Sequence, residues 1–195
     1  LFLYMIYIMS MNLGTIWNNY PASNTKIINK PNIKRNQPLP KNVNNISTRS
    51  FWGAPTWYFF HTIASRINPT FYANNYEFVW DFIKDVCAHI PCPYCQRHAI
   101  DYTSKIAIHS VNSKEKLETV MFDFHNFVNT RTGKKRENRT MLQKYKKANI
   151  KAIFDLFEVR FFHSYIGRRN FDDWIKNDFK TKYYNFYNTV RTQFN

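Results

Sequence analysis

Two cysteines separated by two residues, Cys92 and Cys95, are the side chains in this sequence most suited to chemistry. Pro91 precedes them and a helix is predicted to begin at Cys92. At a helix start, unpaired backbone N–H groups and the helix dipole stabilise a thiolate, which is the nucleophile in thiol–disulfide exchange. Two intervening residues keep both sulfurs within one helical turn, so a disulfide can close between them. The motif therefore indicates a redox-active pair.

The same motif also permits a zinc site. Cys92, Cys95 and His98 supply three ligands at a suitable spacing, and another histidine could be the fourth. The candidates for that fourth ligand are His89, His109 and His125. Against zinc, no second Cys-x-x-Cys or paired-histidine motif follows, as structural zinc sites usually have. The third cysteine, Cys87, makes the count odd, which is unlike a secreted disulfide framework.

A second group of side chains suits a flat aromatic cofactor. Trp57 and His61 lie one helical turn apart, as do His125 and Asn129, each pair beside an apolar stripe. Trp and His rings can stack on a planar ligand, and Asn amides, including that of Asn126, can hydrogen-bond to its ring or phosphate edges. Taken singly, each residue has an ordinary structural explanation. Their combination favours a cofactor site.

Composition limits the remaining function classes. The 195 residues allow one ordinary domain with tails, and a formal charge of +15 suggests polyanion binding. However, the abundant Asn, Ile, Lys, Phe and Tyr all have A/T-rich codons, so the charge is weak evidence for nucleic acid, which we do not expect as a partner. A basic helical module that is stabilised by zinc and binds nucleic acid is the alternative. No apolar run is long enough to span a membrane, and the run Leu1–Met9 lacks the basic flank and cleavage site of a signal peptide.

The fold class predicted is all-α, a four-helix bundle with additional C-terminal helices. Residues 1–49, rich in Asn and Pro, are expected to form a flexible arm. No proline follows Pro93, and apolar residues recur with helical spacing. The bundle helices are expected at about residues 55–66, 74–90 and 92–108, and from residue 113 past 128. Thr56 is expected near the cap of the first helix, and Ser113 is expected to be the N-cap of the fourth. Two more helices are expected in a basic, aromatic extension over 137–195, one with its stripe over 150–161 and one capped by Asn170.

The predicted helix at 74–90 has two apolar stripes and therefore needs two neighbours, its own core and another surface such as a second subunit. The stripes consist of Phe78, Phe82 and Val86, and of Trp80, Ile83 and Cys87.

Three motifs in order resemble the successive signatures of the Erv/ALR family of FAD-linked sulfhydryl oxidases. They are Trp57-x3-His61-x2-Ala64 after Gly53, then Pro91-Cys92-x2-Cys95, then His125-Asn126-x-Val128-Asn129-x3-Gly133-Lys134. The resemblance covers about residues 50–136, taken as the oxidase domain, and is strongest to members of large DNA viruses.

The resemblance implies a homodimer of helical bundles, each holding FAD non-covalently at the bundle mouth. It makes Cys92 the sulfur attacked by a substrate thiolate and Cys95 the sulfur next to the flavin. It assigns FAD binding to Gly53, Trp57, His61, His125, Asn126, Val128, Asn129 and Lys134, and adenine stacking to Tyr145. The stripe that contains Trp80 would fit the dimer face.

The activity implied by the resemblance is oxidation of dithiols to disulfides, with O2 reduced to hydrogen peroxide. Neither tail carries a shuttle cysteine pair, so the expected partner is a separate dithiol protein or a small Cys-x-x-Cys carrier, met in the host cytoplasm or the virion. Two features depart from the family. Ala54 stands where many members have Arg, so we expect a phosphate contact to be either missing or supplied by another cation such as Lys134 or Lys135. Cysteines for a structural disulfide after the Cys-x-x-Cys region are absent.

Overall fold

The computed structural model describes residues 44–165 and 172–195. Residues 1–43 of the predicted arm lie outside this part of the chain, and so does Asn170, the predicted cap of the last helix. The described elements are α3 (Asn44–Arg66), α4 (Pro69–Ala88), α5 (Pro93–Ser104), η1 (Ile108–Val111), α6 (Lys114–Arg131), η2 (Arg139–Lys147), α7 (Ile150–His163) and α8 (Asp173–Val190). Within these ranges the only β-type pairing is one isolated bridge between Ile67 and Phe194. The predicted all-α fold is confirmed.

The first two helices begin earlier than predicted. Helix α3 runs through Pro55 from Asn44, and Thr56 is not a cap, because its buried hydroxyl donates a hydrogen bond to the Trp52 carbonyl at 2.8 Å. Helix α4 has its N-cap at Asn68, and a kink at Asn75 separates its first turns from the apolar stripes. The early segments also reach the core, through the buried Trp52 of α3 and Tyr72 of α4, so the apolar spacing marks only part of each helix.

The next helices follow the prediction more closely. Ser113 caps α6 as expected, its hydroxyl accepting from the Lys116 N–H at 3.3 Å. Helix α5 starts behind Cys92 but ends at Ser104, and η1 follows as a separate short turn. Helix α8 is capped by Asp172 without a side-chain hydrogen bond. The turn η2 was not anticipated.

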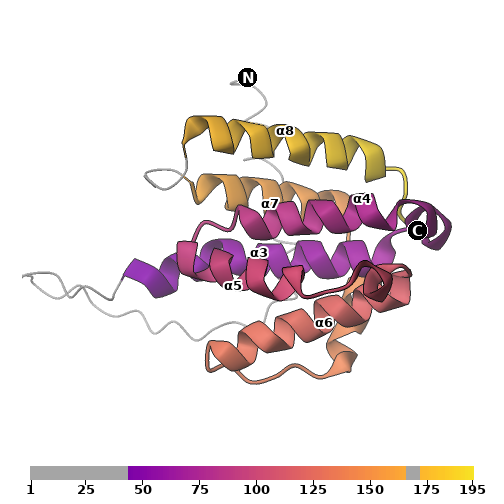
Figure 1. The fold of residues 1–195 in the computed structure, drawn as a ribbon, viewed down its shortest axis with the longest axis horizontal. Coiled ribbons are helices and arrows are strands. Elements are labelled where there is room, and N and C mark those ends of the chain that lie inside the picture. Colours follow the sequence, from indigo (N-terminus) through magenta and orange to yellow (C-terminus); the bar gives the residue numbers. More distant parts are fainter. Residues whose placement is uncertain (1–43, 166–171) are drawn as a thin grey trace, which may run out of the picture. The chain divides into compact units, whose positions relative to one another are not determined.

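Helix α3 lies in the middle of the described helices, with α7 and α8 on one side and α6 and η2 on the other (Figure 1). Phe59 on α3 stacks on Phe157 of α7, with ring centroids 4.2 Å apart. Trp57 meets Phe124 of α6 edge-on at 5.2 Å. Residues two apart on a helix point to opposite sides, so α3 contributes to two packing layers at once.

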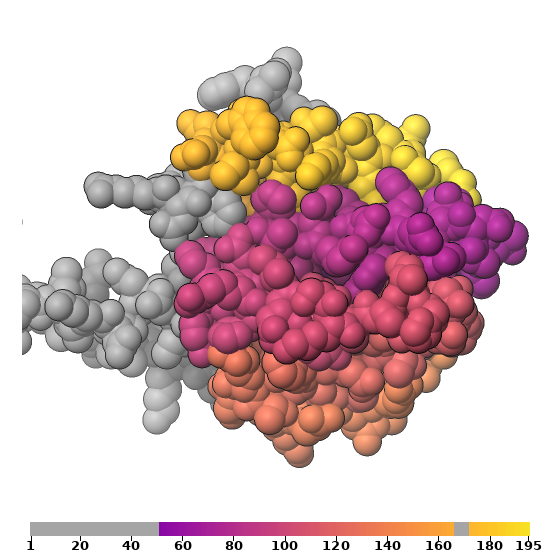
Figure 2. All heavy atoms as spheres, in the orientation of Figure 1, coloured from indigo at the N-terminus to yellow at the C-terminus, as the bar shows by residue number. Residues whose placement is uncertain are grey.

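The second stripe of α4 is buried within the chain itself, and α8 packs against the first stripe, in which Phe78 stacks on Phe186 but remains 41% exposed. Phe82 stacks on Phe186 of α8 at 3.9 Å, and the space-filling view shows α8 running along α4 (Figure 2). Trp80, Ile83 and Cys87 are 2%, 0% and 0% exposed. The expectation that this second stripe forms a dimer face is therefore wrong, because the stripe points into the bundle and α8 occupies the other face.

The extension shares the central hydrophobic core. The buried Tyr183 of α8 donates its hydroxyl to the Phe154 carbonyl of α7 at 3.0 Å, and Tyr165 donates to the His89 carbonyl beyond α4. These bonds join α7 and α8 to each other and to the bundle. In the described ranges, no helix has the length and apolar character needed to cross a membrane.

This packing predicts that the extension contributes to global stability. Phe186→Ala should lower the free energy of unfolding by about 3–5 kcal/mol, because it removes a buried ring stacked on Phe82. Trp174→Ala, at a position 76% exposed on the same helix, is the control and should change it by less than about 0.5 kcal/mol. Urea unfolding followed by circular dichroism measures both, and equal effects would contradict the shared core.

Candidate functional site

The cysteine pair forms the start of α5. Cys92 is the N-cap in an extended conformation, Pro93 occupies the first helical turn, and Cys92 is joined to Cys95 by a disulfide with Cα atoms 5.2 Å apart. The backbone N–H of Cys95 also points at the Cys92 sulfur, 3.3 Å away. The helix start therefore offers its dipole to both sulfurs, and the Cys95 N–H to the Cys92 sulfur, which favours a thiolate on reduction.

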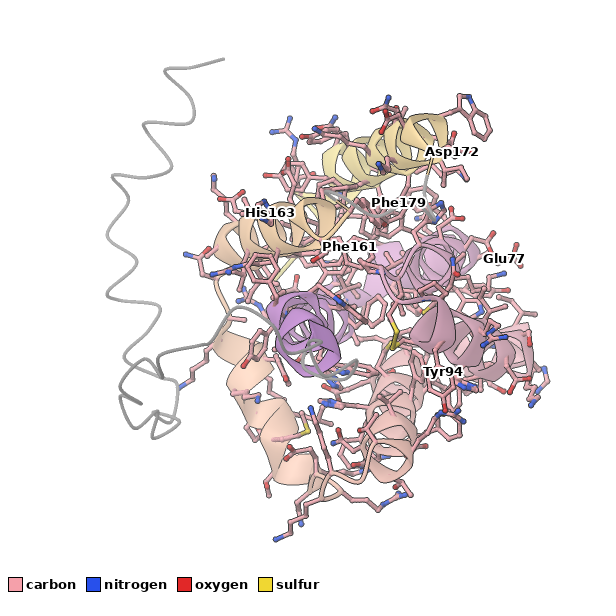
Figure 3. All side chains as sticks on the ribbon, turned by 90° about the vertical axis from the view of Figure 1, so that its left-hand side faces the viewer. Glu77, Tyr94, Phe161, His163, Asp172 and Phe179 are labelled. Atoms are coloured by element: carbon pink, nitrogen blue, oxygen red, sulfur yellow. A yellow bond between two sulfur atoms is a disulfide. The ribbon has the colours of Figure 1, made fainter. Side chains whose placement is uncertain are left out.

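The disulfide is half-buried against the central core, the same core that Trp57 joins. In contrast, Tyr94 between the two cysteines is 52% exposed. Figure 3 shows the disulfide beside the α5 ribbon, close to the labelled Tyr94. The pair thus lies at the boundary between the apolar interior and the solvent-exposed surface.

Four of the predicted cofactor residues come together in one ring cluster, which consists of Trp57, His61, His125 and Tyr145. The Trp57 and His125 rings are stacked, with centroids 4.1 Å apart and planes 6° apart. The His61 and Tyr145 rings are stacked at 4.8 Å. A hydrogen bond of 2.9 Å joins Nε2 of His61 to Nδ1 of His125. The cluster is built by one turn of α3, the middle of α6 and the end of η2.

One buried nitrogen in this cluster has no partner among the described residues, Nδ1 of His61. Only one of the two bonded nitrogens, Nε2 of His61 and Nδ1 of His125, carries the proton of their hydrogen bond. In either tautomer Nδ1 of His61 remains unpaired, as a buried acceptor or as a buried donor. An unpaired buried polar atom destabilises the fold by about 1–3 kcal/mol, so a ligand that supplies the missing bond would be favoured.

Both histidines are neutral at neutral pH. Burial lowers the pKa of His61 to about 3, with further contributions from His125 and Lys144. Burial also lowers the pKa of His125 to about 4, helped by the positive charges of Lys144 and Lys134. The cluster therefore presents uncharged rings with nearby cations, which suits a flat ligand that carries negative charge.

Lys144 is a site residue that the sequence reasoning missed. Its ammonium lies 4.9 Å from the Tyr145 ring centroid and 5.5 Å from that of Tyr58. Burial lowers the pKa of Lys144, while Glu137 acts in the opposite direction. Its position directly before Tyr145, the predicted adenine contact, was the available signal.

A short strap after α6 brings η2 back to α3. Gly133 has φ +70°, a conformation that glycine adopts without strain, and the Lys134 N–H donates to the Asn129 carbonyl at 2.8 Å. The buried Asn126 holds the Glu137 backbone on both sides, accepting from its N–H at 2.7 Å and donating to its carbonyl at 3.2 Å. Asn126 and Asn129 thus fix the segment that positions Lys144 and Tyr145.

The remaining predicted residues are less closely joined to the ring cluster. Val128 is half-buried on α6 and Lys134 is exposed on the strap, while no described contact links Gly53 to the rings. For the zinc alternative, the described ranges contain no group of three His, Cys, Asp or Glu side chains arranged to hold a metal. His98 instead contacts Arg131.

The neutral histidines predict a pH-dependent stability. A folded pKa below the unfolded value of about 6.5 means that the unfolded chain binds the proton first, so stability is complete above about pH 6.5 and falls as the pH drops towards about 4. His125→Gln should reduce the slope of unfolding free energy against pH, between about pH 6 and 5, by up to about 1.4 kcal/mol per unit. Urea unfolding at several pH values measures it, with the exposed His109→Gln as control. An unchanged slope in His125→Gln would contradict the buried neutral pair.

Comparison with known proteins places these features in a family. The family model described as "Erv1 / Alr family" matches residues 54–150, a segment that contains the boundary predicted at 136 and takes in η2. The 347L protein of Invertebrate iridescent virus 6, named as an FAD-linked sulfhydryl oxidase, is 35% identical over 95 residues, 43% of this chain and 80% of that protein. The FAD-linked sulfhydryl oxidase of African swine fever virus is 32% identical over 85 residues, 43% of this chain and 70% of that protein.

A third relative, the 096R protein of Invertebrate iridescent virus 3, also named as an FAD-linked sulfhydryl oxidase, is 31% identical over 97 residues. The chain spans 66% of its length, just under two thirds, and 49% of this chain is aligned. No solved structure matches significantly. The predicted similarity to proteins of large DNA viruses is confirmed. On the matched segment and on the 80% coverage of 347L, this chain belongs to the Erv1/Alr family.

Proposed function

We propose that the protein is an FAD-dependent thiol oxidase that converts a dithiol and O2 into a disulfide and hydrogen peroxide. The observation that carries the proposal is the Cys92–Cys95 disulfide at the start of α5, in the same core as Trp57 of the ring cluster. The names of the viral relatives, which specify FAD-linked sulfhydryl oxidases, support it. The reaction moves two electrons and two protons from the dithiol to O2.

The ring cluster fits FAD by the chemistry of its groups. Planar neutral rings suit an aromatic ligand, the unpaired Nδ1 of His61 offers a hydrogen bond, and Lys144 and Lys134 supply positive charge for phosphate. When bound, FAD supplies an acceptor that takes an electron pair from thiols and that O2 can reoxidise. In this proposal Lys144 and Lys134 provide the positive charge that many family members obtain from an arginine at the position of Ala54.

The cysteine pair performs the exchange with the substrate. A substrate thiolate attacks the Cys92 sulfur, the Cys92–Cys95 bond breaks, and Cys95 leaves as a thiolate near the helix start. The second substrate thiolate then attacks the substrate sulfur of the mixed disulfide and releases Cys92. The substrate leaves oxidised, and the electron pair remains on the two cysteines of α5.

The substrate in this proposal is a dithiol protein or a small Cys-x-x-Cys carrier. The homodimer that the family resemblance implies must use a surface other than the stripe of Trp80, Ile83 and Cys87, because that stripe is buried within the chain. The location of the protein in the host cytoplasm or the virion stays a prediction.

Replacing either cysteine tests the redox roles. Purified wild-type protein should show flavin absorption near about 450 nm and produce peroxide with dithiothreitol. Cys92→Ser and Cys95→Ser should keep the flavin and lose at least about a hundredfold of this activity, because no exchangeable disulfide remains. Cys87→Ser, at the buried third cysteine, is the control and should retain activity. Dithiol-dependent peroxide production in either exchange-site variant would refute its role.

Replacing His125 tests the cofactor site. His125→Ala removes the ring stacked on Trp57 and should lower the flavin content per protein by more than about half, because stacking of this kind contributes about 0.5–1.5 kcal/mol beyond buried area. The ratio of flavin to protein absorbance measures the effect, and the exposed His109→Ala is the control. Full flavin content in His125→Ala would show that this histidine does not hold the cofactor.

A further inference from the structure

Arg131, in the last turn of α6, reaches across to the cysteine motif on α5. Its Nη2 donates a hydrogen bond of 2.6 Å to the hydroxyl of Tyr94, and its guanidinium lies over the Tyr94 ring, 5.1 Å from the centroid. The same Nη2 contacts Nε2 of His98, one turn after Cys95. A cation from another helix is therefore fixed against Tyr94, one of the two residues between the reactive cysteines.

The surface around Tyr94 is positively charged. Arg97 is exposed on α5, and its charge together with that of Arg131 helps to lower the pKa of His98, after burial as the first cause. Asp101, the acidic residue whose charge acts on His98, is already paired with Lys105 at 2.8 Å. In the part of the chain that the structure describes, no carboxylate forms an ion pair with Arg97 or Arg131. Their charges are thus available to a partner.

We propose that the exposed Tyr94, Arg97 and Arg131 form a docking surface for acidic thiol substrates, in which Asp or Glu side chains beside the substrate cysteines pair with the two arginines. The proposal rests on the proposed thiol oxidase function and names its substrate class. An acidic segment of a protein fits better than a long polyanion, because Arg131 lies over the half-exposed Tyr94 ring beside the disulfide and Arg97 follows one turn later on α5. The reacting cysteine of the substrate must arrive at this disulfide.

The charge also suits the chemistry of the first step. The group that attacks the disulfide is a thiolate, which is negative, and a positive local potential raises the concentration of anions at the surface. Because the Arg131 guanidinium is held by both Tyr94 and His98, it is ordered before the substrate arrives, so less side-chain freedom is lost on binding. Acidic substrates should therefore be favoured in the second-order rate of exchange.

The test uses the full-length flavoprotein and three dithiol peptides that differ only in charge. Each carries Cys-Gly-Gly-Cys flanked on both sides by two Glu, two Gln or two Lys residues, and peroxide formation gives kcat/KM. At low ionic strength the wild type should prefer the Glu peptide to the Lys peptide roughly tenfold or more, and 0.5 M NaCl should remove most of this preference.

Charge reversal then assigns the preference to this surface. Arg131→Glu should lower the ratio of the two kcat/KM values roughly tenfold, and Arg97→Glu, which leaves the Tyr94 contact in place, roughly threefold. Lys180→Glu makes the same change in net charge on the exposed face of α8, on the side of α3 opposite α6 (Figure 1), and should leave the ratio within roughly twofold. Thermal melts confirm that each variant is folded.

The outcomes separate the two proposals. Dithiothreitol is uncharged, so peroxide formation from it by the wild type tests the oxidase function alone. If dithiothreitol is oxidised but the Glu and Lys peptides react equally, or if the preference persists in both arginine variants, the docking surface is wrong and the oxidase function stands. If dithiothreitol is not oxidised, both proposals fail together.

Discussion

The buried position of α3 is the constraint on which the rest of the structure depends. On one side of this helix Phe59 packs against the α7 rings, and on the opposite side Trp57 and His61 enter the ring cluster. A rotation of the helix that improved one side would displace the other, because side-chain directions on one helix are fixed relative to each other. The aromatic packing of the extension therefore helps to orient the rings that are proposed to hold the cofactor.

The second requirement is the return of the chain after α6. The residues beyond α6 are strongly basic and, on their own, would extend into solvent. Asn126 prevents this by binding the Glu137 backbone through both sides of its amide, and Gly133 provides the change of direction. The Asn126 amide, which was predicted to bind a ligand, thus also holds the backbone that brings Lys144 and Tyr145 to His61. Structural and binding roles coincide in this motif.

Local signals in the sequence were sufficient for much of the fold and site. The Ser113 cap, the cysteine pair at a helix start, and the spacing of Trp57 and His61 all depend on neighbours within a turn, and the structure has them as predicted. The start of α3 could not be predicted, because Pro55 and the polar, asparagine-rich residues before it are typical of a loop. The local sequence therefore gives no sign of the helix that begins at Asn44. The turn η2 and Lys144 also escaped prediction, because their positions depend on the strap and not on any period in the sequence.

The two stripes of α4 show that an apolar pattern predicts the number of neighbours of a helix but not which segments they are. The pattern correctly required two neighbours, but it could not tell a second subunit from a later helix of the same chain. Phe186 lies more than a hundred residues after Phe82, and only the folded chain brings them together.

One member of the buried stripe has a further consequence for work with this protein. Cys87 is fully enclosed in α4, and burial raises the pKa of its thiol, so it stays protonated and out of reach of reagents in solution. An alkylating reagent added to the native chain therefore labels only the α5 pair, and only after reduction, whereas the third sulfur is labelled once the chain is unfolded. Mass spectrometry of labelled native protein thus reports the oxidation state of the α5 pair without interference, and the extra label marks molecules that have lost their fold.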